Sequence, residues 1–168
     1  MDMGESLVGA YLRQVRGCHT VAYNTFLPWA QGELDVIGVA LGEGDGPVRV
    51  WLAEVAVHLN GLDYGGSGGY AATAAKVATK TAAARRYAAE VYPDALVCIE
   101  LWSPIVPRGL LHRLREVEVE LVVNETFTDK VADLLREAGS GTRLTGDPAF
   151  RLLQVLTHLR GAGQLRLT

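Results

Sequence analysis

The sequence predicts an α/β protein in which helices cover a mixed central sheet. Helical and strand patterns follow one another as helix, three strands, helix and strand, then a further strand and more helices. Two apolar segments flank the turn GEGDGP at 42–47, which is typical of an antiparallel hairpin. A long alanine-rich helix then separates two apolar strands, and this order predicts a parallel, right-handed β-α-β unit.

The N-terminal half is predicted to form one helix and three strands. Residues 5–16 have helical periodicity, because apolar side chains recur three and four positions apart, and Gly17 is a suitable stop. The apolar positions are Leu7, Val8, Tyr11, Leu12 and Val15. Segments rich in β-branched and aromatic residues predict strands over 19–27, 32–41 and 48–59.

The next segments are predicted to complete the sheet. Residues 71–92 are rich in alanine and have high helix propensity, and Pro93 ends that helix. The apolar run 95–102 is expected to be an inner strand of the sheet. Residues 116–123 alternate between charged and apolar side chains, which is typical of an edge strand with one wet face.

The C-terminal part is predicted to be helical. One helix is expected over 128–139, and another begins with Asp147 as its cap and Pro148 at its first position. We therefore expect residues 1–124 to form the α/β core. Residues 125–168 are expected to be a helical extension that packs on the core or forms a homodimer contact.

Composition excludes several classes of protein. The chain is 49% hydrophobic with a formal net charge of −3, which argues against disorder and against a strongly basic nucleic-acid coat protein. It lacks an eighteen-residue apolar stretch and an N-terminal secretory pattern, so we expect a cytoplasmic protein with no membrane partner. Cys18 and Cys98 are expected to be buried free thiols, because no Cys/His spacing suited to zinc is present.

The glycine-rich segment NGLDYGGSGGY at 60–70 is predicted to be a flexible loop. It lacks the GxxxxGK[ST] pattern of a phosphate-binding loop. A small-molecule enzyme built on this segment is therefore the least favoured of the functions considered.

Three carboxylates on neighbouring strands are the first candidate site. Glu33 and Asp35 lie two positions apart and share one face, and Glu54 joins that face if the strand register permits. Carboxylates that converge repel one another, and such clusters usually persist because a divalent cation binds them. Ligands that are all oxygen favour Mg²⁺ or Mn²⁺. The alternative is an exposed sheet face with solvated charges.

Four segments in order resemble the PD-(D/E)XK nuclease superfamily, in particular the YraN-like family related to Holliday junction resolvases. They are GESLVGAYLRQVRG at 4–17, GELDVIG at 32–38, VWLAEVAVH at 50–58 and KVATKTAAARRYAA at 76–89. The resemblance covers roughly residues 4–92. It implies a three-layer α/β/α restriction-endonuclease-like fold with a mixed central sheet.

The resemblance also implies roles for single residues. Asp35 and Glu54 would bind Mg²⁺ or Mn²⁺, and Glu33 and Glu5 would be supporting metal-site carboxylates. The family places a lysine two residues after the glutamate of the third strand, where this chain has Ala56. That lysine would orient the attacking water or stabilise charge at the phosphate.

Three hypotheses account for the missing lysine. Lys76 or Lys80 replaces it from the following helix, where the two lie four positions apart on one face. Alternatively His58, on the strand face of Glu54, acts as a general base near neutral pH. In the third hypothesis the site is inactive and the fold only binds a partner.

The sequence thus predicts an Mg²⁺-dependent DNA endonuclease-like phosphodiesterase. Arg85 and Arg86 are the candidate phosphate contacts, although they do not fully share a helical face with Lys76. The alternative is a catalytically inactive nuclease-fold module that binds DNA or a protein partner. His112 and His158 have no ligand partner at suitable spacing and are interpreted as structural or surface residues.

Overall fold

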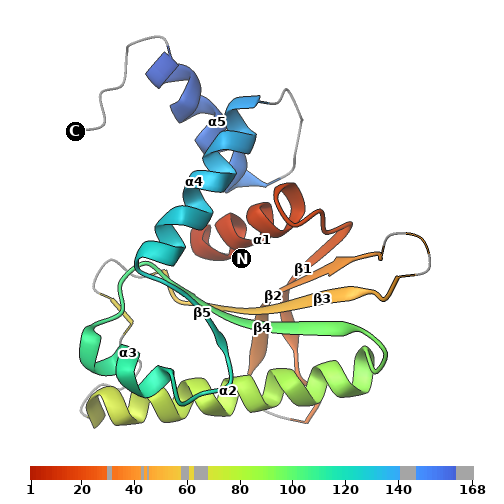
Figure 1. The fold of residues 1–168 in the computed structure, drawn as a ribbon, viewed down its shortest axis with the longest axis vertical. Helices are drawn as coiled ribbons and strands as arrows, with labels where there is room; N and C mark the ends of the chain where they lie inside the picture. Colours follow the sequence, from red (N-terminus) through yellow and green to blue (C-terminus); the bar gives the residue numbers. More distant parts are fainter. Residues whose placement is uncertain are drawn as a thin grey trace.

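The computed structural model describes residues 1–29, 32–42, 44, 46–57, 61–62, 68–140 and 147–161. Within these residues the chain is an α/β protein with a five-stranded mixed sheet and helices on both faces (Figure 1). The predicted fold class is therefore confirmed at this level.

The sheet has the strand order β1-β2-β3-β4-β5, which is also the order along the chain. The strands are β1 (Thr20–Phe26), β2 (Glu33–Ala40), β3 (Arg49–Val55), β4 (Leu96–Ser103) and β5 (Glu120–Val123). The first three are antiparallel to one another, and β3, β4 and β5 are parallel. The predicted hairpin and the parallel β-α-β unit are both confirmed.

Helix α1 (Met3–Gln14) packs on one face of the sheet. Asp2 and Glu5 form a reciprocal capping box, in which each side chain accepts a hydrogen bond from the other's backbone N–H at 2.8 Å. Gly17 follows the helix with a φ of 71°, a left-handed conformation that favours glycine. The predicted helix is confirmed, with its start two residues earlier than expected.

Helix α2 (Gly69–Val91) packs on the opposite face. It buries a narrow stripe, and its remaining surface is largely exposed. The buried residues are Thr73, Val77, Thr81, Ala84 and Ala88. Alanines on this stripe pack against apolar side chains of β2 and β3.

Helix α3 (Arg108–Leu114) was not predicted from the sequence. Leu110 and Leu114 lie four positions apart and are fully buried in a cluster that also holds Val77 of α2. This i, i+4 pair was the available signal, but a helix of seven residues has too few turns for a clear periodicity.

Helices α4 (Glu125–Ser140) and α5 (Pro148–Gly161) lie on the α1 side and extend away from the sheet (Figure 1). Phe127 of α4 and Phe150 of α5 share a hydrophobic cluster with α1 and the sheet. α5 begins at Pro148 as predicted, while α4 begins three residues earlier than expected. The division at residue 124 remains a prediction.

Two strands are shorter than predicted. The expected strand over 48–59 ends at Val55, and the expected strand over 116–123 begins only at Glu120, because residues 115–119 form turns and bends.

Most of the glycine-rich segment lies outside the described residues. None of the helices in the described part of the chain is both long and apolar enough to cross a membrane.

Candidate functional site

Asp35 and Glu54 lie side by side on adjacent strands. β2 and β3 are antiparallel with Val36 opposite Ala53, so the next position brings Asp35 opposite Glu54. Residues opposite each other in an antiparallel pair project to the same face. The condition that the sequence left open, the strand register, is therefore met.

Asp35 is a buried carboxyl group with only one hydrogen bond among the described contacts. It is 8% exposed, and its Oδ2 accepts the backbone N–H of Val55 at 2.7 Å. Burial raises the pKa of Asp35 to about 7, and the Glu54 carboxylate adds to the rise. The hydrogen bond from Val55 and the charge of Lys80 act in the opposite direction. Asp35 is therefore a costly anion that a nearby cation would stabilise.

Lys80 of α2 forms an ion pair with Glu54 through its Nζ and the Glu54 Oε1. The Glu54 side chain is 13% exposed and the Lys80 side chain is 35% exposed, so this ion pair is partly shielded from solvent where α2 meets the sheet. Lys76, one turn earlier, is exposed. Of the two helix lysines named from the sequence, the structure brings Lys80 to the carboxylate pair.

Glu5 approaches the same end of the sheet from α1. Its Oε1 accepts a hydrogen bond from Asn24 Nδ2 at 3.2 Å, and its charge contributes to the raised pKa of Asp35. Asn24 lies opposite Asp35 on β1, by extension of the pairs Tyr23–Val36 and Thr25–Leu34. Its φ of 50° is unusual for a strand residue. Asn24 was not predicted from the sequence as a site residue, and a polar residue within a predicted strand was the available signal.

Ala56 occupies the position that the resemblance assigns to lysine. It is 1% exposed and lies in an apolar cluster with Val77, Leu101 and Leu110. Its backbone N–H donates to the carbonyl of Trp102 at 2.9 Å. A lysine ammonium at this position would be enclosed by aliphatic side chains, so the alanine suits the packing.

The structure does not test two further candidates named from the sequence, Glu33 and His58. Glu33 is half-buried at the start of β2, opposite Phe26 of β1, and no hydrogen bond or ion pair of the described residues includes it. His58 lies outside the described residues. Their predicted roles therefore remain predictions.

Arg85 and Arg86 make contacts within the protein. Arg85 Nη2 donates to the carbonyl of Glu118 at 2.9 Å and pairs with its carboxylate at 3.1 Å. Arg86 pairs with Glu90 at 2.8 Å, and its guanidinium lies 4.5 Å from the ring centroid of Trp29. Both arginines are exposed, and their predicted role in binding phosphate remains untested.

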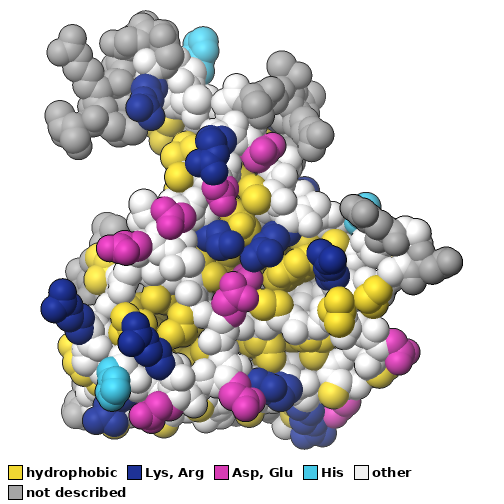
Figure 2. Space-filling view, in the orientation of Figure 1, with side chains coloured by type: hydrophobic (Ala, Val, Ile, Leu, Met, Phe, Trp, Pro, Cys, Tyr) yellow, Lys and Arg dark blue, Asp and Glu magenta, His cyan; other side chains and the backbone are white. Residues whose placement is uncertain are grey.

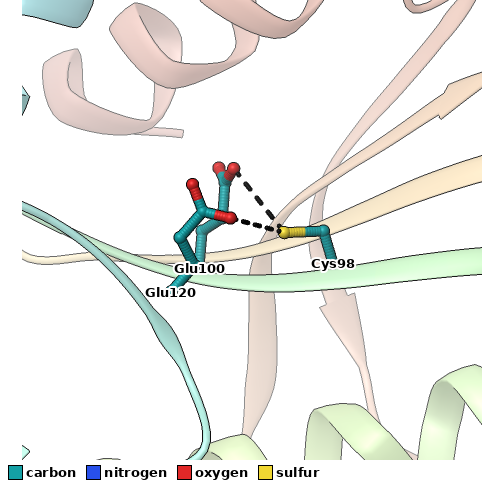
Figure 3. Close-up of side chains that lie close together, drawn as sticks. All are labelled: Cys98, Glu100 and Glu120. Atoms are coloured by element: carbon teal, nitrogen blue, oxygen red, sulfur yellow. Dashed lines mark hydrogen bonds between the residues drawn. The ribbon is translucent and has the colours of Figure 1, made fainter. Parts of the chain in front are cut away.

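A second acidic cluster, formed by Cys98, Glu100 and Glu120, lies on the α1 side of the sheet (Figure 3). One potential ligand atom from each residue lies within 4.8 Å of the others. Glu100 is fully buried, and one of its oxygens accepts the Trp102 indole N–H at 2.7 Å. The Cys98 thiol donates to Glu120 at 3.1 Å. This cluster was not predicted from the sequence, because its members come from two parallel strands with a helix between them.

A guanidinium group of the protein lies beside this second cluster. Arg16 Nη2 lies 3.6 Å from Glu100 Oε1, and its guanidinium also lies over the rings of Tyr11 and Trp51. Burial, aided by the hydrogen bond to Glu120, raises the pKa of the Cys98 thiol to about 12. A protonated thiol beside a fixed guanidinium is a poor ligand for a metal cation. We therefore interpret this cluster as structural.

The Asp35–Glu54 pair has a different chemical capacity. Its donors are carboxylate oxygens, which suit Mg²⁺ or Mn²⁺, and Mg²⁺ often binds one or two protein carboxylates together with substrate phosphates. The residues present therefore fit a divalent cation, with an amine close by. Comparisons of this chain with protein-family models, with curated proteins and with solved structures found no match.

Proposed function

We propose that this protein is a metal-dependent nuclease of the PD-(D/E)XK type that hydrolyses phosphodiester bonds in DNA. The observation that carries the proposal is the pair of Asp35 and Glu54 on adjacent strands, with the Lys80 amine at Glu54. The order of one helix, three antiparallel strands, a crossover helix and a parallel strand is compatible with a three-layer restriction-endonuclease-like fold.

In this proposal the carboxylates and the lysine have different roles. Asp35 and Glu54 would hold Mg²⁺ or Mn²⁺, with Glu5 as a neighbouring carboxylate. The bound ion would supply Lewis-acid activation of the phosphodiester and of a water molecule. Lys80 takes the place of the motif lysine, and its ammonium stabilises negative charge that develops at the phosphate. Because the pKa of Asp35 is raised to about 7, its carboxyl group is readily protonated near neutral pH when no cation is bound.

One observation favours the alternative of an inactive nuclease-fold module. Ala56 is buried among apolar side chains, so the strand position of the motif lysine offers no ammonium. The two functions differ in the role of Lys80. An active enzyme requires its amine for cleavage, whereas a binding module requires only a compatible surface.

Cleavage of labelled linear, flapped and four-way DNA with Mg²⁺ or Mn²⁺ tests the proposal. Asp35→Asn, Glu54→Gln and Lys80→Met are each expected to lower the cleavage rate by about 100-fold or more, because each removes a charge that acts on the reacting phosphate. Lys76→Met is the matched control, since it removes a lysine one turn earlier on the same helix.

Activity that survives both carboxylate substitutions would exclude the metal site. Loss of activity with Lys76→Met rather than Lys80→Met would show that the wrong lysine had been assigned. A wild-type protein that binds DNA and cleaves none of the three substrates supports the inactive module.

A further inference from the structure

The exposed face of α3 is strongly basic. Arg108, His112 and Arg115 follow one another at i, i+4 and i+7, which places them on one side of the helix, and Arg113 lies beside them. All four side chains are exposed. Figure 2 shows Lys and Arg side chains gathered around a His side chain over α3. The segment 108–115 contains no acidic residue, although the whole chain has a net charge of −3.

These arginines differ from most others in the described part of the chain. Arg13, Arg16, Arg85, Arg86 and Arg136 each form an ion pair with a carboxylate. Within the residues that the structure describes, no ion pair involves Arg108, Arg113 or Arg115. No carboxylate of the described chain therefore lies within ion-pair distance of these three guanidinium groups, although Glu116 follows Arg115 directly in the chain.

α3 is anchored beside the candidate site. Its buried residues Leu110 and Leu114 pack in one cluster with Ala56 and Val77. Ala56 is two residues after Glu54 on the chain, and Val77 is one helical turn before Lys80. The same cluster that excludes a lysine from position 56 thus holds α3 near the end of the sheet where Asp35 and Glu54 lie, with the basic face on the side of the helix away from Leu110 and Leu114.

We propose that the basic face of α3 binds the phosphate backbone of duplex DNA next to the candidate site. This inference rests on the proposed nuclease function, and it assigns the contact to α3 in place of Arg85 and Arg86. A helix rises about 1.5 Å per residue, so Arg108 and Arg115 are separated by roughly 10 Å along the helix axis. That length matches about three phosphates of one DNA strand, at about 3.4 Å of axial rise each. Guanidinium groups can bind such phosphates through paired hydrogen bonds.

Fluorescence anisotropy with a labelled DNA duplex tests the inference, with EDTA present and sodium chloride varied from about 50 to 200 mM. The variant with Arg108→Gln, Arg113→Gln and Arg115→Gln is expected to bind at least about tenfold more weakly at low salt. The slope of log affinity against log salt should become shallower by about 2.7, because each lost phosphate contact contributes about 0.9.

The matched control removes three arginines from α4 and α5, with Arg136→Gln, Arg151→Gln and Arg160→Gln. The control changes the net charge by the same amount, but on α4 and α5, which pack on the α1 side of the sheet. The control is expected to keep a salt slope close to that of the wild type. Far-UV circular dichroism and the melting temperature confirm that both variants fold.

Several outcomes would overturn the assignment of α3. They are equal weakening in both triple variants, no weakening in the α3 variant, no DNA binding by the wild type, and binding of an RNA duplex but not of DNA. Failure of the nuclease function is distinguishable from these results. In that case the wild type cleaves no DNA, yet its metal-free binding still depends on the α3 arginines, which leaves the surface assignment standing.

Discussion

The molecule has two carboxylate clusters on opposite faces of one sheet, and they are built differently. Glu100 and Glu120 lie on the α1 side with Cys98, and their potential ligand atoms approach one another closely. Asp35 and Glu54 lie on the α2 side, where the amine of Lys80 forms an ion pair with Glu54. By proximity alone, the first cluster is the better candidate for a metal ion.

The groups around each cluster favour the opposite choice, in which the Asp35–Glu54 pair is the better candidate for a metal ion. Glu100 faces the guanidinium of Arg16 and the indole N–H of Trp102, so groups of the protein already satisfy its oxygens. Asp35 has one backbone donor, and burial and the charge of Glu54 raise its pKa to about 7. Each cluster thus holds one carboxylate paired with a protein cation, and burial raises the pKa of Glu100 as well as that of Asp35. The clusters differ in that Glu100 also accepts a side-chain donor, whereas Asp35 accepts only a backbone N–H among the described contacts, so the groups around a carboxylate count for more than the closeness of a second one.

The largest expected effect is on the pH dependence of stability through Asp35. Its pKa rises from 3.8 to about 7 on folding, so the folded state retains the proton and stability falls as the pH rises from about 4 to 7. Asp35→Asn removes this loss. At pH 8 in EDTA the variant is expected to be more stable by up to about 4 kcal/mol, at about 1.4 kcal/mol per pKa unit.

Urea denaturation at several pH values measures this difference. Below about pH 4 both the folded and the unfolded wild type hold the proton, so the variant and the wild type should converge there. A constant difference across the whole range would mean that Asp35 is not the source.

The second prediction concerns Glu100. Glu100→Ala leaves a cavity and an indole N–H without its acceptor, and it removes the partner of Arg16, so we expect a loss of about 3 kcal/mol. Glu100→Gln keeps an acceptor for Trp102 and should cost about 1 kcal/mol or less, because the buried charge is removed together with its desolvation cost. Urea denaturation of both variants measures the contrast, and equal losses would argue against a mainly structural role for this cluster.

The smallest expected effect is stabilisation by the metal ion. At a Mg²⁺ concentration about ten times its dissociation constant, preferential binding to the folded state adds about 1.4 kcal/mol, which a thermal melt detects as a rise in melting temperature. Asp35→Asn is expected to abolish the rise, whereas Glu120→Gln is expected to retain it. The opposite pattern would move the metal site to the α1 side of the sheet.

Local sequence patterns predicted much of the framework. The turn at 42–47 and the alternation of its flanking strands predicted the hairpin, while the common face of Asp35 and Glu54 still depended on the strand register that the structure supplies. Strand alternation and turn chemistry involve residues that are close along the chain, so they can be predicted without the rest of the fold. The α2 helix and its two candidate lysines were predicted for the same reason, since helical periodicity is local.

Other features depend on segments that are distant in sequence. The choice of Lys80 over Lys76 depends on the rotation of α2 about its axis, which its buried stripe sets against the sheet. Asp147 was predicted only as a helix cap, yet its carboxylate also binds Arg13 at 2.5 Å and accepts the Tyr23 hydroxyl at 3.1 Å. Such contacts join α5 to α1 and β1, and no local pattern encodes their partners.

The sequence by itself determined the hairpin, the parallel β-α-β unit and the order of all helices and strands except α3, and it named the two carboxylates on neighbouring strands. Only the tertiary structure decided which amine pairs with Glu54, that Arg16 pairs with Glu100, and that α3 packs through Leu110 and Leu114 next to Ala56. The physical reason is that periodicity specifies which side of an element is buried. The contacts of a long charged side chain depend on how separate elements pack against one another.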